Sequence, residues 1–345
     1  MSSRPPSSVM HITQPQGGVK KTDRLLRWIV VALLIVSVIV TTAYTALSIY
    51  IATQLVYAPQ KPIYATPASL GLQFKYVTFP SRIDQVQLKG WYIPGVLPDG
   101  SLTSQRTIIM VHGDRTNRAD KDAGLLNLSV DLARHGFAVL AFDMRGSGES
   151  SPEPLSLGYF EQRDVLGAVD FLRSGTVPYP DLGRTRIIGG WGVSMGAATL
   201  LMATAQEPAI RAVVSDCAYS EIIPILEREV PERGHLPALF TPGALFAARV
   251  LYGMDFYAVR PVDIVASIAP RPIFFIHGTS DTYVPTPNMN ILAAAARTAP
   301  NANVQTWLVP GATHAQSFNS EGAVYVDRVV AFYTAALGPD TGVSK

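Results

Sequence analysis

The sequence has only one cysteine, Cys217, in 345 residues. A single cysteine cannot form a disulfide within the chain, and without CxxC pairs or clustered Cys and His there is no signature of a zinc site or a redox dithiol. Charged residues are also scarce, at 16% with a net charge of +2, and beyond the N-terminal tail they form no basic stripe. The composition therefore argues against metal centres, thiol redox enzymes and nucleic-acid partners.

Apolar residues are abundant, at 48%, and one uncharged run of them is long. The residues from Trp28 to Tyr50 carry no charge, and the next charge after Arg27 is Lys61. As an α-helix this run is about 34 Å long, which suffices for a bilayer core of roughly 30 Å. It predicts a transmembrane helix over 28–50, with a long buried helix of a soluble core as the alternative.

The charges around this run predict its orientation. Only Lys61 lies in the twenty residues after it, whereas five basic residues precede it: Arg4, Lys20, Lys21, Arg24 and Arg27. This bias predicts a cytoplasmic N-terminus and an extracytoplasmic C-terminal domain. A cleaved signal peptide is the alternative, but the run exceeds the usual signal core of about 7–15 residues, which favours an uncleaved signal-anchor.

The rest of the chain divides by composition. We expect a disordered cytoplasmic tail over 1–27, a stalk over 51–71, one folded domain over 72–338 and a short tail over 339–345. A partly alternating pair, 74–79 and 86–93, predicts a hairpin at a sheet edge. Continuous apolar strands alternate with helical segments and predict an α/β fold with a mostly parallel sheet flanked by helices. These strands are predicted at 107–112, 137–143, 186–192, 211–216, 272–277 and 304–309.

One interval breaks this alternation. Residues 219–261 are too long for a connection and too apolar for a free loop. We interpret them as a helical lid insertion over the C-terminal edge of the sheet, with packing filler as the alternative.

The stretch GGWGVSMGAATLL places Ser194 between a predicted strand and a predicted helix. Its G-x-S-x-G core, with Gly192 and Gly196 as the glycines, predicts a nucleophile elbow, a turn too sharp for side chains at the flanking positions. Helix packing through small residues is the alternative. A phosphate-binding loop would need a lysine or further spaced glycines, and neither is present.

A serine nucleophile needs a base and an orienting acid, in the chain order Ser, acid, His for this strand–turn–helix context. Asp281 and His314 each follow a predicted strand, so both should emerge at the sheet edge that presents Ser194. Asp216 is the alternative acid.

Other titratable residues at strand ends have structural explanations. His277, His112 and Asp143 are interpreted as turn residues, and Asp263 as a helix N-cap. The oxyanion would be bound by the backbone N–H groups of Met195 and Asp114, with the Asp114 carboxylate turned away toward Arg115 or Arg118.

Together VHGDRTNR, FDMRGSGES, GVSMGAATLL, HGTSDTYVP and GATHAQSF resemble, in order, the motifs of the α/β-hydrolase superfamily over about 72–338. GVSMGAATLL looks most like its membrane-tethered branch, akin to monoacylglycerol lipases, protein-depalmitoylating thioesterases and serine aminopeptidase-like hydrolases. The resemblance implies Ser194 as nucleophile, His314 as base, Asp281 as orienting acid, and no cofactor. The loop at Asp114 departs from the family's glycine-rich pattern.

We therefore expect a membrane-anchored serine hydrolase that cleaves carboxylic esters or thioesters, with a small-molecule or lipid-like ester as substrate and the bilayer contacted through 28–50. A serine peptidase is the nearest alternative, because the same triad cleaves amides. A non-catalytic membrane-anchored binding protein on the same fold is the alternative from another class.

Overall fold

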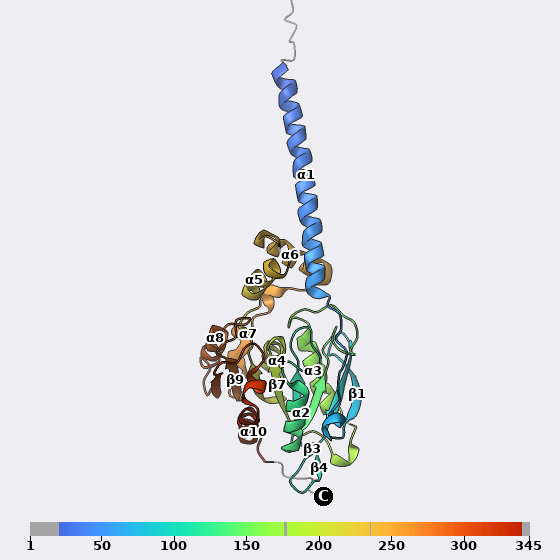
Figure 1. Cartoon of the computed structure of the whole chain (residues 1–345), viewed down its shortest axis with the longest axis vertical. Coiled ribbons are helices and arrows are strands. Elements are labelled where there is room, and N and C mark those ends of the chain that lie inside the picture. The colour runs from blue at the N-terminus through green and yellow to red at the C-terminus, as the bar shows by residue number, and fades with distance from the viewer. Residues whose placement is uncertain (1–20, 176–177, 235, 340–345) are drawn as a thin grey trace, which may run out of the picture. The chain divides into compact units, whose positions relative to one another are not determined.

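The computed structural model describes residues 21–175, 178–234 and 236–339 (Figure 1). They divide into two units, one ending at Leu47 and the other beginning at Ser48. Helix α1 (Lys21–Val56) begins in the first unit and ends in the second. Its segment Asp23–Val56 contains an 18-residue stretch with a mean hydropathy of 2.4 and is long and apolar enough to cross a membrane, a test that a signal sequence also passes.

Helix α1 is longer than the predicted 28–50 at both ends. Residues 21–27 of the expected tail are helical, whereas residues 1–20 and 340–345 of the two expected tails lie outside the described residues. Residues 51–56 of the expected stalk form the last turns of α1. The helix continues because no proline or glycine intervenes before Pro59, and its end is held because Ala52 and Val56 are fully buried in the domain core.

The central sheet has eight strands in the order β1-β2-β6-β5-β7-β8-β9-β10. The β1–β2 and β2–β6 pairs are antiparallel and the other pairs are parallel, so the predicted mostly parallel sheet is confirmed. The strands are β1 (Lys75–Pro80), β2 (Gln87–Ile93), β5 (Arg106–Val111), β6 (Ala138–Phe142), β7 (Ile187–Val193), β8 (Ile210–Asp216), β9 (Ile273–Gly278) and β10 (Val304–Val309).

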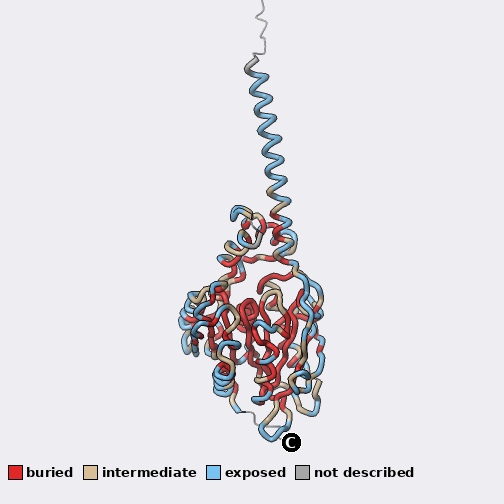
Figure 2. The backbone as a smooth tube through the Cα atoms, viewed as in Figure 1, coloured by how far each residue is buried: buried red, intermediate tan, exposed pale blue. Residues whose placement is uncertain are grey.

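Helices cover both faces of the sheet, and the strands between them form the buried centre of the domain (Figure 2). One core cluster joins the sheet to α3 (Glu161–Arg173), α4 (Met195–Gln206) and α8 (Pro287–Ala296). The other joins it to α2 (Leu125–Arg134) and α10 (Ala323–Leu337). Strands β5 and β6 are buried at every residue, which explains why their sequences are continuous rather than alternating apolar runs.

The interval 219–261 is helical, as expected. It contains α5 (Ile223–Gly234) and α6 (Thr241–Tyr252), with short 3₁₀ turns before and after α6. A two-stranded ribbon of β3 (Gly95–Val96) and β4 (Leu102–Thr103) was not expected from the sequence, because strands of two residues carry no periodic signal.

Candidate active site

Ser194 lies at the junction of β7 and α4, where the sequence places the elbow. Its backbone has φ 55° and ψ −123°, a conformation that a residue with a side chain adopts only under strain. A Cβ on Gly196 would lie 2.3 Å from the carbonyl oxygen of His112, and one on Gly192 would lie 2.6 Å from the carbonyl oxygen of Gly196. Both positions therefore need glycine, because the obstacle in each case is backbone.

The structure brings Ser194, His314 and Asp281 together from the ends of three strands. His314 follows β10 and places Nε2 at 2.8 Å from the Ser194 Oγ. Asp281 follows β9, and its Oδ2 lies 2.8 Å from the other ring nitrogen, Nδ1. Because a carboxylate only accepts hydrogen bonds, Nδ1 carries the proton and Nε2 is the acceptor for the serine hydroxyl. The side chain of Asp281 is fully buried, whereas that of His314 is 23% exposed.

Asp281 is held by more than His314. Its Oδ1 accepts hydrogen bonds from the backbone N–H groups of Tyr283 at 3.0 Å and Val284 at 2.9 Å. Burial alone would raise the pKa of Asp281, but hydrogen bonds from His277, His314 and Val284 outweigh it and lower the pKa to about 2. The carboxylate is therefore ionised at every pH near neutrality.

His277 supports the triad, a role that the interpretation as a turn residue did not include. It is the fifth residue of β9 and is fully buried. Its Nε2 lies 2.7 Å from the carbonyl oxygen of Val284 and 3.4 Å from Asp281 Oδ2, so one N–H ties the loop after β9 to the triad carboxylate. The HGTSD motif could have indicated this role, because its histidine and aspartate are four residues apart across a strand end and can meet around the turn.

Asp216, the alternative acid, is bound elsewhere. Its carboxylate accepts hydrogen bonds from Ser317 Oγ at 2.9 Å and from Tyr325 OH at 2.9 Å. Those donors come from α9 (Ser317–Glu321) and α10, so Asp216 joins the end of β8 to the C-terminal helices. Burial raises the pKa of Asp216 to about 6, although both hydroxyl groups favour its charged form.

The raised pKa of Asp216 makes stability depend on pH in a defined direction. Between pH about 4 and about 6 the folded chain keeps a proton on Asp216 that the unfolded chain releases. Raising the pH through this range should therefore lower the free energy of unfolding by up to about 3 kcal/mol. We expect Asp216→Asn to lack this decline. Thermal unfolding of the full chain in detergent at pH 4.5 and 7.5 measures it; parallel pH dependence of the two proteins would contradict the assignment.

The remaining titratable candidates have structural roles. His112 Nε2 accepts the Met144 N–H at 3.0 Å, and buried Asp143 forms an ion pair with Arg118. The N-cap interpretation of Asp263 is wrong: helix α7 (Pro261–Ile264) begins at a proline, so Asp263 lies inside its first turn. Its carboxylate instead pairs with Arg260 at 2.6 Å.

The loop after β5 lies beside the elbow, as the oxyanion prediction requires. A Cβ on Gly113 would be 3.6 Å from that of Ser194, and the next residue, Asp114, lines the same cavity as Ser194 and Met195. The Asp114 carboxylate lies 3.4 Å from Arg115 Nε, while Arg118 pairs with Asp143.

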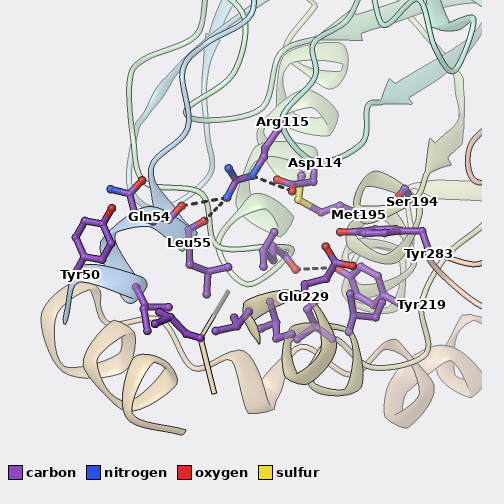
Figure 3. Close-up of a pocket in the computed structure, with 17 residues that line it drawn as sticks. Tyr50, Gln54, Leu55, Asp114, Arg115, Ser194, Met195, Tyr219, Glu229 and Tyr283 are labelled. Atoms are coloured by element: carbon purple, nitrogen blue, oxygen red, sulfur yellow. Dashed lines mark hydrogen bonds and ion pairs between the residues drawn. The ribbon is translucent and has the colours of Figure 1, made fainter. Parts of the chain in front are cut away.

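Arg115 also connects this loop to the end of α1. Its Nη2 donates to the carbonyl oxygens of Gln54 at 3.2 Å and Leu55 at 3.1 Å (Figure 3). A guanidinium at a helix C-terminus satisfies carbonyl groups that have no partner within the helix and complements the helix dipole. The sequence does not predict this contact, because the residues lie about sixty positions apart in the chain.

A cavity of about 390 Å³ opens at Ser194. Apolar side chains from the end of α1 and from α5 form much of its wall, and Asp114, Arg115, Glu229 and Tyr283 bring polar groups to it (Figure 3). The apolar residues from these two helices are Ile51, Leu55, Ile225, Leu226 and Val230. The cavity can hold an apolar group next to the serine, and α5, from the interval 219–261, contributes part of its wall.

Potential metal ligands also meet here: Cys217, Asp281 and His314 each place one ligand atom within 4.8 Å of the others. Burial raises the pKa of the Cys217 thiol well above its ordinary value, so the thiol is neutral and a poor metal ligand. The facing atoms of Asp281 and His314 already bind each other. The arrangement therefore favours acid–base chemistry over metal binding.

Comparisons with known proteins agree with this architecture. A family model described as alpha/beta hydrolase fold matches residues 106–241. The chain is 28% identical to the uncharacterized protein YfhR of Salmonella typhi over 323 residues, 90% of this chain and 97% of that protein. It is 27% identical to the uncharacterized protein YqkD of Bacillus subtilis, over 66% of this chain and 70% of that one.

Two solved structures share the fold. The Pyrococcus furiosus esterase Pf2001 superposes with a TM-score of 0.66 at 24% identity, covering 82% of this chain and 99% of that one. The Pyrococcus horikoshii acylaminoacyl peptidase superposes with a TM-score of 0.59 at 18% identity, covering 79% of this chain and 43% of that one.

Proposed function

Because the chain belongs to the α/β-hydrolase superfamily, we propose that it is a serine hydrolase that cleaves carboxylic esters or thioesters through an acyl-enzyme. The observation that carries the proposal is the hydrogen-bonded sequence Ser194–His314–Asp281, with 2.8 Å at each step, at an apolar cavity. An unaided serine hydroxyl is a poor nucleophile near neutral pH, and this arrangement supplies the base and the orienting carboxylate that it needs.

In the proposed mechanism Ser194 Oγ attacks the acyl carbon while His314 Nε2 takes the hydroxyl proton. Asp281 holds the imidazole in the tautomer with the proton on Nδ1 and stabilises the imidazolium that forms. His314 then gives the proton to the departing alcohol or thiol. A water molecule then gives a proton to the same Nε2 and attacks the acyl carbon, and His314 passes this proton to Ser194 Oγ as the bond between Oγ and the acid breaks.

The developing oxyanion would be bound by the backbone N–H groups of Met195 and Asp114. Met195 is the first residue of α4, where N–H groups have no carbonyl partner within the helix. The proximity of Gly113 to Ser194 supports the second donor, Asp114. The nearby Arg115 guanidinium offsets the charge of the Asp114 carboxylate, which would otherwise oppose the oxyanion.

The apolar cavity supports an acyl chain as the group held beside Ser194. The purified full chain should therefore hydrolyse nitrophenyl esters of medium-length acids faster than the acetate and faster than aminoacyl amides. Faster turnover of the amides would favour a peptidase, the alternative for which the acylaminoacyl peptidase fold offers precedent. No turnover, together with no labelling of Ser194 by a fluorophosphonate, would favour a non-catalytic binding protein.

We further propose that α1 anchors the enzyme in a membrane with the N-terminus in the cytoplasm and the folded domain on the other side. The uncharged run from Trp28 to Tyr50 and the basic residues before it support this topology. In sealed, right-side-out membrane vesicles, the extracytoplasmic face is on the outside. A protease added to these vesicles should degrade the domain, and full protection of the domain would contradict the topology.

A further inference from the structure

Among the large apolar side chains exposed on the lid and around the end of α1, six lie on α6, in the last turns of α1 or directly after it. On α6, Phe246 and Val250 lie four residues apart on one helix face and are 68% and 64% exposed, and Leu251 is exposed beside them. The other three come from Ile49, Tyr50 and Tyr57. Single exposed apolar residues are ordinary on a protein surface, but a group of this size marks an interaction site. We refer to these six residues as the lid patch.

The two halves of the lid patch are held together by Tyr252, at the end of α6. Its hydroxyl oxygen lies 3.0 Å from Thr53 Oγ1, and its ring packs edge to face on that of Tyr57, with centroids 5.8 Å apart. The opposite face of α6 is buried, through Ala244 and Ala248. The α6 half of the lid patch is thus the outer side of a helix whose inner side packs on the domain.

The position of Ile49 and Tyr50 in the sequence indicates what covers the lid patch. Ile49 and Tyr50 end the uncharged run that is proposed to span the membrane, and Thr53 lies only about 4.5 Å further along the helix. A lid tied to α1 at Thr53 is therefore held within about one helical turn of the end of that run. Tyrosines are enriched at this level of a bilayer, which fits the exposed Tyr50 and Tyr57.

We propose that the lid patch docks into the interfacial layer of the bilayer that holds α1. The inference rests on the proposed anchor. Its consequence for the enzyme follows from the cavity wall, which is built from the same elements: Ile51 and Leu55 from α1, and Ile225 and Leu226 from α5. With the lid docked, the cavity wall lies next to the bilayer, so an acyl chain can reach Ser194 from the lipid without crossing bulk water.

Site-specific fluorescence tests the docking directly. The full chain is placed in lipid nanodiscs, one chain in each, with an environment-sensitive fluorophore on Phe246→Cys, Val38→Cys or Ile291→Cys. The native Cys217 is buried and common to all three. We expect lipids with a nitroxide on the acyl chain to quench the label at 246 strongly, and iodide in water to quench it weakly.

Two positions are matched controls. Ile291 is an exposed apolar residue of α8, outside the lid patch, and its label should respond to iodide and not to nitroxide lipids. Val38 lies within the uncharged run, and its label should be quenched by the lipids. No quenching at 38 would overturn the anchor and the docking with it. Lipid quenching at 38 without quenching at 246 would overturn the docking alone, and shielding at 246 from both quenchers would indicate a protein contact instead.

A charge on the lid patch should affect only substrates that reside in the bilayer. We expect Phe246→Glu and Val250→Glu to lower turnover of a vesicle-borne ester about tenfold and that of a soluble short-chain ester less than twofold. Ile291→Glu should change neither. An equal loss of turnover on both substrates would contradict docking. If the chain without substitutions did not hydrolyse the soluble ester at all, the proposed hydrolase activity itself would be contradicted.

Discussion

Ser194→Ala is expected to lower ester turnover by about 10⁴- to 10⁶-fold. The activity that remains would come from oxyanion stabilisation and substrate binding alone. The hydroxyl removed is the one that lies 2.8 Å from His314 Nε2, so the variant loses the covalent step and keeps the base. The fold should persist, because the change deletes one oxygen atom from a residue that is only 8% exposed and leaves the elbow glycines unchanged. Single-turnover kinetics with a nitrophenyl ester measures the effect.

A matched serine separates this effect from a general loss of stability. Ser220 is also buried and donates to Asn288 Oδ1 at 2.8 Å, away from the triad. Ser220→Ala should retain turnover within a few fold and keep fluorophosphonate labelling, which Ser194→Ala should lose. If Ser194→Ala kept more than about a tenth of the activity, the nucleophile would have to be another group.

The place of these side chains is predictable from the sequence because a parallel sheet fixes where strand ends lie. The predicted strands that became β7, β9 and β10 are parallel and all point their carboxyl ends to one edge, although β10 is half exposed rather than buried on both faces. Ser194, Asp281 and His314 each come shortly after one of these strands, and the chain order then assigns their roles. Proximity at one edge was therefore predictable from the strand ends, but a 2.8 Å separation was not.

What the sequence could not predict are contacts between segments without a shared pattern. Arg115 binds carbonyl groups at the end of α1, and Tyr252 binds Thr53 from about two hundred residues away. No periodicity relates these positions, and the helix end itself was expected about six residues earlier, at Tyr50. His277 was interpreted as a turn residue because a histidine before a glycine at a strand end has that explanation more often than a supporting role.

Asp281→Asn is expected to lower turnover by about 10⁴-fold, although an amide has almost the same shape as the carboxylate. Asp281 Oδ2 now accepts the Nδ1 proton of His314, and an amide NH₂ in its place would donate and favour the tautomer with the proton on Nε2. His314 could then not take the proton of Ser194. The backbone N–H groups of Tyr283 and Val284 favour this outcome, because they need the remaining oxygen as an acceptor and so turn the NH₂ toward His314.

Asp216→Asn is the matched control for this variant, since it makes the same change in a buried carboxylate that binds Ser317 and Tyr325 instead of His314. It should keep turnover within a few fold, and equal losses in both variants would contradict the choice of Asp281 as the orienting acid. Because the pKa of Asp281 is about 2, its carboxylate is charged throughout the assay range, so the loss in Asp281→Asn should not follow any titration of residue 281 from pH about 6 to about 9. A loss that disappeared toward the acidic end of this range would mean that a group titrating there, rather than the fixed charge of Asp281, orients the base.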